Sequence, residues 1–346
     1  MEEKIKVLVV DDAGVMRRAV VDILNSDPMI EVIDTAENGL VGLEKAQRLQ
    51  PDVITLDMDM PVMNGISAIR HIMIKCQIPI VVLSSLFADG AITFEALRLG
   101  VVDFVPKPSG AVSRDLNKGK EMIIDRVKLA AAVKVGNIHR AKLPSLSENK
   151  PENSSRETLP PEALVIIGTN LCGPNTVIRM IATLPPILRA GIVVIQDISL
   201  KILATFAEQF DKSVPWKIHA LQEDTIIEPG RCYIGSTETS LSFTTSTEGK
   251  PLVLVGGPVD RPIDLLYSSA AATFQGPIVG VLLGGIGDDG AEGLGMIQRH
   301  QGTTLVQDTH YCVFPNLTEN AIRCGVADKI VKDRDLAAAV QQTLES

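Results

Sequence analysis

Short apolar runs alternate with amphipathic stretches along the first 110 residues. The runs are too short for helices and have the continuous apolar character of strands that are buried on both faces. They cover residues 7–10, 31–35, 53–56, 78–84 and 101–105. The stretches between them place apolar residues at helical spacing and cover residues 15–25, 39–50, 66–75 and 91–99, the last stopping at Gly100 as a typical helix cap. Because strands and helices alternate, we predict an α/β domain with a doubly wound parallel sheet.

The pattern changes in the middle of the chain and then returns. Residues 113–135 have helical spacing and predict one long helix, whereas residues 137–161 are polar and rich in Pro and Ser, which is typical of a linker. Strands are then predicted at 163–167, 192–196 and 279–283, and helices at 175–183, 204–210 and 294–300. We therefore predict a first domain over residues 1–124, a linker over 125–161, and a second parallel α/β domain over 162–346.

Acidic side chains end two of the predicted strands in the first domain. Asp11 and Asp12 follow the first strand, and Asp57 ends the third. The carboxyl ends of parallel strands meet at one edge of the sheet, where α/β proteins bind their ligands. Three carboxylates at that edge suit an oxygen-preferring cation such as Mg²⁺. The alternative, acids that simply close strands in solvated turns, accounts for either segment alone better than for both together. Ser84 and Lys107 belong to the same edge.

Composition and charge narrow the function classes. The net charge of −9 disfavours a nucleic-acid backbone or an anionic membrane as the principal partner. The start of the chain lacks the regions of a signal peptide, and no apolar run approaches the about 18 residues of a membrane span. The five cysteines form no CxxC pair and indicate neither a zinc site nor a disulfide framework. We expect a cytoplasmic protein with reduced thiols and no membrane insertion.

Residues 5 to about 124 resemble the receiver domain of two-component response regulators, which has a flavodoxin-like fold. The resemblance rests on the acid pair, on Asp57 with Pro61 and Gly65 following at fixed distances, and on the later hydroxyl and Lys-Pro. It implies that a histidine kinase phosphorylates Asp57. It also implies a Mg²⁺ ion held by Asp11, Asp12, Asp57 and the backbone carbonyl of Asp59.

The same resemblance assigns roles to three further residues. Lys107 would supply the cation that pairs first with Asp57 and then with its phosphate, because phosphoryl transfer needs its oxygen charges neutralised. Ser84 would donate a hydrogen bond to the new phosphate and draw its loop inward. Phe104 would reorient with that loop, so the three residues form the expected phosphorylation switch.

Receiver, linker and second domain together resemble the chemotaxis protein-glutamate methylesterase family. The markers of the second domain are residues 167–168, 194–196, 227–233, 287–294, 307–308 and 312–313. The resemblance implies a Rossmann-type effector domain with a Ser-His-Asp triad. Such a domain hydrolyses glutamyl methyl esters on chemoreceptors and deamidates receptor glutamines, and its receiver covers the site until phosphorylation.

Two of the three residues at the family's catalytic positions are of a different type in this chain. The family's nucleophile position is Asn170 here, the general-base position is Asp197, and only the acid remains, as Asp289. An amide nitrogen does not attack an ester, and no imidazole is available to take a proton. We therefore expect the family's methylesterase and deamidase activity to be lost or strongly impaired.

Three other kinds of chemistry in the second domain stay as alternatives: a cysteine nucleophile, a pair of aspartates and phosphate binding. Cys172 lies at the predicted helix start and is the alternative nucleophile, although His219, His300 and His310 all fall in segments where the family varies. Asp197 and Asp289 could act together as acid and base for another hydrolysis. The glycine-rich turns at 168–173 and 284–293 match no phosphate-binding motif, and Asp288 and Asp289 in the second turn would repel phosphate.

The sequence thus favours a phosphorylation-controlled response regulator whose degenerate effector domain works by regulated binding to a chemoreceptor or another signalling protein. Two alternatives stay open at this point. The chain could still demethylate or deamidate receptors by residual or altered chemistry. It could also be a phosphate sink that drains phosphoryl groups from a shared kinase.

Overall fold

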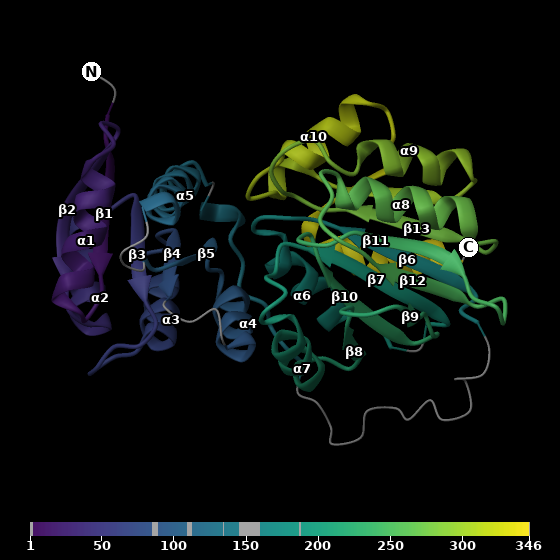
Figure 1. The fold of residues 1–346 in the computed structure, drawn as a ribbon, viewed down its shortest axis with the longest axis horizontal. Coiled ribbons are helices and arrows are strands. Elements are labelled where there is room, and N and C mark those ends of the chain that lie inside the picture. The colour runs from purple at the N-terminus through teal and green to yellow at the C-terminus, as the bar shows by residue number, and fades with distance from the viewer. Residues whose placement is uncertain are drawn as a thin grey trace. The chain divides into compact units, whose positions relative to one another are not determined.

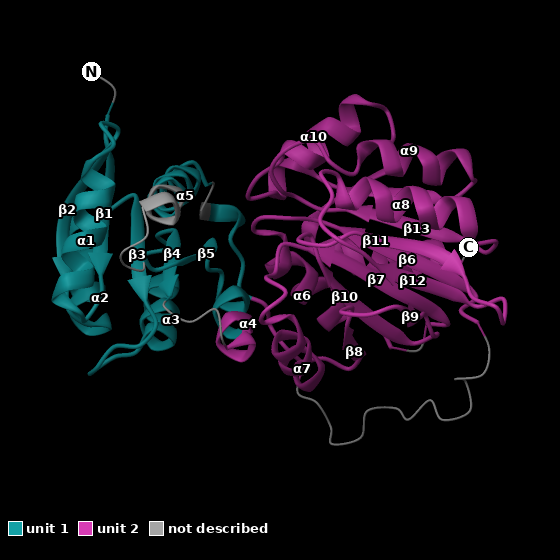
Figure 2. Cartoon of the chain, in the orientation of Figure 1, with its two compact units in different colours: residues 1–88, 95–140 teal, residues 89–94, 141–346 magenta. Residues whose placement is uncertain are grey.

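The structure is a computed structural model of the chain. It describes residues 3–84, 89–108, 113–133, 135–144, 160–186 and 188–345, and for residues 113–118 and 135 it describes the backbone only. The chain divides into two compact units, residues 1–88 with 95–140 and residues 89–94 with 141–346 (Figure 2). Residues 145–159 of the predicted linker lie outside the described residues, so the predicted domain boundaries stay predictions.

A five-stranded parallel sheet forms the centre of the first unit, with strand order β2-β1-β3-β4-β5. Its strands are β1 (Ile5–Val10), β2 (Ile30–Ala36), β3 (Val53–Asp57), β4 (Ile80–Ser84) and β5 (Asp103–Pro106). The helices are α1 (Gly14–Asn25), α2 (Gly39–Leu49), α3 (Gly65–Lys75), α4 (Gly90–Leu99) and α5 (Ser113–Ala131), and a short 3₁₀ helix, η1 (Val135–Asn137), follows. Helix α1 packs beside α5, and α2 packs beside α3 (Figure 1). The strand order reverses at β1 and β3, which places the expected phosphorylation site at the switch point of the sheet.

The predicted alternation of strands and helices in this unit is confirmed, with small shifts at the ends. Strand β5 begins two residues later than predicted because residue 101 still belongs to the helix cap. Gly100 has a left-handed φ of 102°, and the backbone N–H of Val101 bonds to the carbonyl of Ala96. The predicted helix over 113–135 ends earlier, at Ala131.

The second unit contains a seven-stranded sheet with order β15-β14-β13-β6-β7-β10-β8, and its described pairings are parallel. The strands are β6 (Ala163–Gly168), β7 (Ala190–Gln196), β8 (Lys217–Ala220), β10 (Arg231–Ser236), β13 (Ile278–Leu282), β14 (Thr303–Gln307) and β15 (Lys329–Val331). Strands β6, β7 and β13 are buried along their whole length. Their continuous apolar sequence, which predicted buried parallel strands, is thereby confirmed.

Helices cover both faces of this sheet (Figure 1). They are α6 (Gly173–Thr183), α7 (Leu203–Ser213), α8 (Pro262–Thr273), α9 (Ala291–Arg299), α10 (Asn316–Arg323) and α11 (Leu336–Leu344), with 3₁₀ turns η2 (Thr309–Tyr311) and η3 (Asp333–Asp335). Helices α8 and α9 pack against each other, and a continuous core joins them to β6, β7 and β13. This packing fixes the loops at the carboxyl ends of those strands.

A small antiparallel sheet was not predicted from the sequence. It consists of β9 (Thr225–Ile226), β11 (Leu241–Thr245) and β12 (Pro251–Val255), in the order β11-β12-β9. Leu241, Phe243 and Val253 turn their side chains into the core against α8. Among the described residues, no helix is both long and apolar enough to cross a membrane.

Candidate functional site

The three acids singled out in the first unit lie together. Asp11 and Asp57 are buried at the ends of β1 and β3, and Asp12 is exposed beside them. One carboxylate oxygen from each lies within 4.8 Å of the others. Neighbouring parallel strands β1 and β3 produce this arrangement by bringing their carboxyl ends to one edge. Three clustered carboxylates of mixed burial are a ligand set that fits a hard divalent cation.

Lys107 completes this cluster with two ion pairs. Its Nζ lies 2.8 Å from Asp11 Oδ2 and 2.8 Å from Asp57 Oδ2. Burial raises the pKa of Asp57, an effect that the hydrogen bond and charge of Lys107 oppose. Burial alone would lower the pKa of Lys107, but its hydrogen bonds to Asp11 and Asp57 outweigh it and raise the pKa. Lys107 is therefore a charged group held against the expected phosphoacceptor.

The other residues predicted for this site lie around the same edge. Ser84 ends β4, and its carbonyl accepts the backbone N–H of Lys107 at 2.9 Å. Phe104 is half-buried on β5, and Asp59 is exposed in the loop after β3. That loop passes close to the site at Gly65, where an added Cβ would lie 2.7 Å from the carbonyl oxygen of Asp57. A glycine is therefore required there by close approach, which explains its fixed distance from Asp57.

The second unit brings the three residues that we predicted at the family's triad positions to one edge of its sheet. Asn170 follows β6, Asp197 follows β7, and Asp289 lies in the turn between β13 and α9. The three strands are consecutive neighbours in the sheet, in the order β13-β6-β7. All three side chains are partly exposed. The edge is thus accessible from solvent, as a binding or catalytic site must be.

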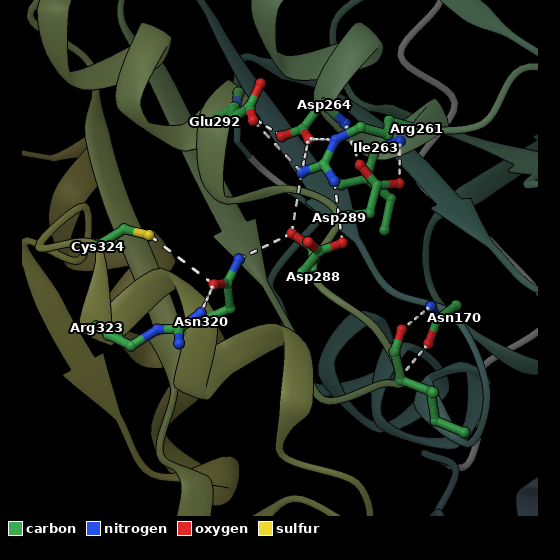
Figure 3. A network of polar contacts seen from close by, with 12 residues as sticks. Asn170, Arg261, Ile263, Asp264, Asp288, Asp289, Glu292, Asn320, Arg323 and Cys324 are labelled. Atoms are coloured by element: carbon green, nitrogen blue, oxygen red, sulfur yellow. Dashed lines mark hydrogen bonds and ion pairs between the residues drawn. The ribbon is translucent and has the colours of Figure 1, made fainter.

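Asn170 is paired with the turn that follows β13. Its Nδ2 donates to the carbonyl of Ile286 at 2.7 Å, and its Oδ1 accepts the backbone N–H of Ile286 at 2.7 Å (Figure 3). Next to this pair, the hydroxyl of Thr169 donates to the carbonyl of Gly284 at 2.6 Å. The side-chain amide at the nucleophile position therefore serves as a bridge between two loops.

Asp289 has a structural role at the start of α8. Its carboxylate accepts the backbone N–H groups of Ile263 at 2.9 Å and Asp264 at 3.0 Å, two donors in the first turn of α8 (Figure 3). In return, Asp264 accepts the N–H of Gly293 at 2.7 Å in the first turn of α9. The two aspartates thus satisfy N–H groups that each helix leaves without an internal partner.

The charges around Asp289 also come from this helix junction. The pKa of Asp289 is raised to about 6, chiefly by burial; its two backbone hydrogen bonds oppose this rise and the carboxylate of Asp264 adds to it. Arg261 pairs with Asp264 at 2.6 Å and with Asp288 at 3.0 Å. The carboxylate that perturbs Asp289 is therefore that of Asp264, which lends no support to a reading in which Asp197 and Asp289 act as a pair.

Cys172 occupies a strained backbone position at the start of α6. Its φ is 64°, in the left-handed region, and its side chain makes no hydrogen bond that caps the helix. The three histidines that a cysteine nucleophile would need as a base make other contacts. His219 stacks on Tyr233, His300 bonds its own helix, and His310 pairs with Asp308. These contacts give no support to a rebuilt Cys-His pair.

A network of polar side chains behind the site, formed by Arg179, Asp333 and Gln307, was not predicted from the sequence. Arg179 on α6 forms an ion pair with Asp333, whose carboxylate also accepts a hydrogen bond from Gln307 Nε2 at 3.1 Å. Gln307 Oε1 accepts the backbone N–H of Gly284 at 2.9 Å. Arg179 and Asp333 are 154 positions apart. No spacing in the sequence signals this link between α6 and the turn that contacts Asn170.

Comparisons with known proteins place both units. The CheB methylesterase family model matches residues 165–340, and the response regulator receiver domain model matches residues 7–114. The protein-glutamate methylesterase/protein-glutamine glutaminase of Pyrococcus horikoshii is 32% identical over 351 residues, covering 100% of this chain and 95% of the relative. The protein of the same name from Symbiobacterium thermophilum is 31% identical, and the match covers 99% of this chain and 98% of that relative. The crystal structure of the Thermotoga maritima CheB methylesterase catalytic domain has 24% identity and a TM-score of 0.48, covering 53% of this chain and 97% of that one.

Proposed function

We propose a function for this chain from its family: it belongs to the CheB methylesterase family and is a response regulator with receiver and methylesterase domains. In this function, phosphorylation of Asp57 controls an effector domain that binds its partner without hydrolysing it. The observation that carries the proposal is the double hydrogen bond between Asn170 and the backbone of Ile286. These bonds support the proposal because they give the residue at the predicted nucleophile position a structural role, the bridging of two loops.

In the receiver, the proposed reaction is transfer of a phosphoryl group from a histidine kinase to Asp57. Asp11, Asp12 and Asp57 would hold Mg²⁺, with the carbonyl of Asp59 as a further ligand, and the ion would neutralise charge on the transferred group. Lys107 is already in contact with Asp57 and would stay paired with the new phosphate. Ser84, at the end of β4, and Phe104, within the neighbouring β5, would transmit the change.

In the effector domain, acyl transfer lacks two requirements. The amide nitrogen of Asn170 shares its lone pair with the carbonyl and is no nucleophile, and Asp197 cannot replace the imidazole of a triad. The backbone N–H of Ile286 faces the nucleophile position as an oxyanion-stabilising donor would, but Asn170 Oδ1 already accepts it. Asp289 persists because α8 needs its carboxylate.

The proposed setting is the cytoplasm, with a chemotaxis-type histidine kinase as phosphodonor and a chemoreceptor or another signalling protein as partner of the effector domain. The relatives' name, protein-glutamate methylesterase/protein-glutamine glutaminase, points to receptor segments rich in glutamate or glutamine side chains. A binding domain derived from such an enzyme would retain contact with these segments while leaving them unmodified.

One comparison separates this function from its two competitors. The affinity of the full chain for chemoreceptor signalling domains is measured with and without a small phosphodonor, for the native protein and for Asp57→Ala. We expect a change of about tenfold or more on phosphorylation, about 1.4 kcal/mol, that Asp57→Ala abolishes. Phosphorylation without any change in affinity would favour a phosphate sink. Release of methanol or ammonia from the receptor would favour a residual enzyme.

A further inference from the structure

The contact between Asn170 and Ile286 has the form of ligand recognition. A side-chain primary carboxamide carries an acceptor oxygen beside an NH₂ donor, and here these two groups bond the N–H and the C=O of one backbone residue at 2.7 Å each. Both bonds are as short as strong neutral hydrogen bonds in proteins. The backbone of Ile286 is therefore fully matched by a primary amide.

Other carbonyl groups would not match this backbone. A carboxylate has no N–H to donate to the Ile286 carbonyl, and a methyl ester also lacks a donor. Each would leave that carbonyl without the donor that an amide supplies, so the amide makes one hydrogen bond more than the acid or the ester. The backbone of Ile286 thus distinguishes an amide from the corresponding acid or ester.

The surroundings allow a close but accessible fit. An added Cβ at Gly285 would lie 2.1 Å from Asn170 Oδ1, so the carboxamide reaches the backbone only because this residue is glycine. Asn170 and Ile286 are partly exposed, so a carboxamide from another molecule could reach the same groups once Asn170 is absent.

We infer that the backbone of Ile286 is a recognition site for a primary carboxamide and that Asn170 is its built-in occupant. The external ligand of the same chemistry is a glutamine or asparagine side chain on a partner protein. Asn170 competes with that side chain and weakens its binding. The inference rests on the proposed function only in taking this edge as a partner-binding surface.

The test is chemical rescue of a cavity variant in the full chain. Asn170→Ala removes the occupant, and acetamide is supplied in solution as the probe. Thermal unfolding is followed by the fluorescence of Trp216, the single tryptophan and fully buried in the second unit. We expect acetamide at about ten times its dissociation constant, a stabilisation of about 1.4 kcal/mol, to raise the Tm of Asn170→Ala by about 3–6 °C more than that of the native protein.

Matched controls show whether the effect belongs to this site. Asn320→Ala removes a carboxamide in the same unit that also donates to a backbone carbonyl, that of Asp288 at 2.9 Å, but leaves Ile286 paired. Its Tm should respond to acetamide as the native protein does. N,N-dimethylacetamide, which cannot donate, should not rescue Asn170→Ala. Equal shifts for all three proteins, or equal rescue by both compounds, would overturn the inference.

A second variant keeps the test decisive if Asn170→Ala does not fold. Asn170→Asp has the same shape but no N–H donor at neutral pH, and should lower the Tm by several degrees. An unchanged Tm would contradict recognition through the Ile286 carbonyl. Because these readouts involve neither phosphorylation nor a receptor, they can fail while the proposed function stands, and the reverse also holds.

Discussion

Arg179 forms a bidentate ion pair with Asp333. The side chain of Asp333 is only 4% exposed. Through Gln307 this pair is connected to the backbone of Gly284, directly before the residues that contact Asn170. The loop that contacts Asn170 is therefore hydrogen-bonded, through Gln307, to a charge pair whose carboxylate is buried.

Removing one partner of this pair should destabilise the second unit strongly. Asp333→Asn leaves the guanidinium of Arg179 without a charged partner, and we expect a loss of about 3 kcal/mol in the free energy of unfolding. Urea unfolding followed by Trp216 fluorescence measures it. The control is Glu162→Gln, which breaks the exposed pair with Arg189 and should change stability by less than about 0.5 kcal/mol. Similar effects of the two changes would contradict a supporting role for Asp333.

Lys107 should control the rate at which Asp57 is phosphorylated. Lys107→Met removes the cation that contacts Asp57, and we expect phosphorylation by a small phosphodonor in the presence of Mg²⁺ to slow by about 10²-fold. Phosphate-affinity gels report the rate. Chelation of Mg²⁺ should abolish the reaction, and Asp57→Asn should show none under any condition. A native rate in Lys107→Met would remove Lys107 from the proposed site.

Asp289 should make the second unit more stable in acid than it would otherwise be. Its pKa is about 6 in the folded protein against 3.8 in a free side chain, so between these values the folded state binds more protons than the unfolded state. Stability should therefore fall as pH rises from about 4 to about 6. Relative to Asp289→Asn, whose side chain does not titrate, we expect a fall of about 1 kcal/mol, since partial exposure screens the effect. Parallel pH profiles of the two proteins, measured by urea unfolding, would contradict this environment for Asp289.

Cys172→Gly should stabilise the chain. A residue with a Cβ is strained at a φ of 64°, whereas glycine is not, and we expect a gain of about 0.5–1 kcal/mol in unfolding free energy after the entropy cost of glycine. Cys172→Ala keeps the Cβ and should bring no such gain. If Cys172→Ala instead removes a hydrolytic activity of the native protein, Cys172 is a nucleophile and not a strained structural residue.

The positions of the site residues could be predicted because they end buried parallel strands. Asp11, Asp57 and Lys107 each follow an apolar run, and the topology of such a sheet brings those ends together. Asn170 and Asp289 were assigned by the family resemblance instead, and the structure places them after the neighbouring strands β6 and β13 of the second sheet.

The contacts of these residues could not be predicted in the same way. The partner of Asn170 is the backbone of Ile286, and backbone groups have no residue type that a sequence pattern could reveal. The pairing of Arg179 with Asp333 depends on how α6 packs near the end of the chain. The small antiparallel sheet was missed because β9 has two residues and β12 contains an exposed leucine, Leu254.

The most direct test of the central claim is methanol release from methylated chemoreceptors by the native chain, with Mg²⁺ and a small phosphodonor, beside an active relative. We expect no release above background although Asp57 is phosphorylated. We also expect that Asn170→Ser combined with Asp197→His, which frees the Ile286 N–H and supplies a base, raises release by about 10²-fold. Phosphorylation-stimulated release by the native chain near the relative's rate would contradict the claim that its effector domain only binds.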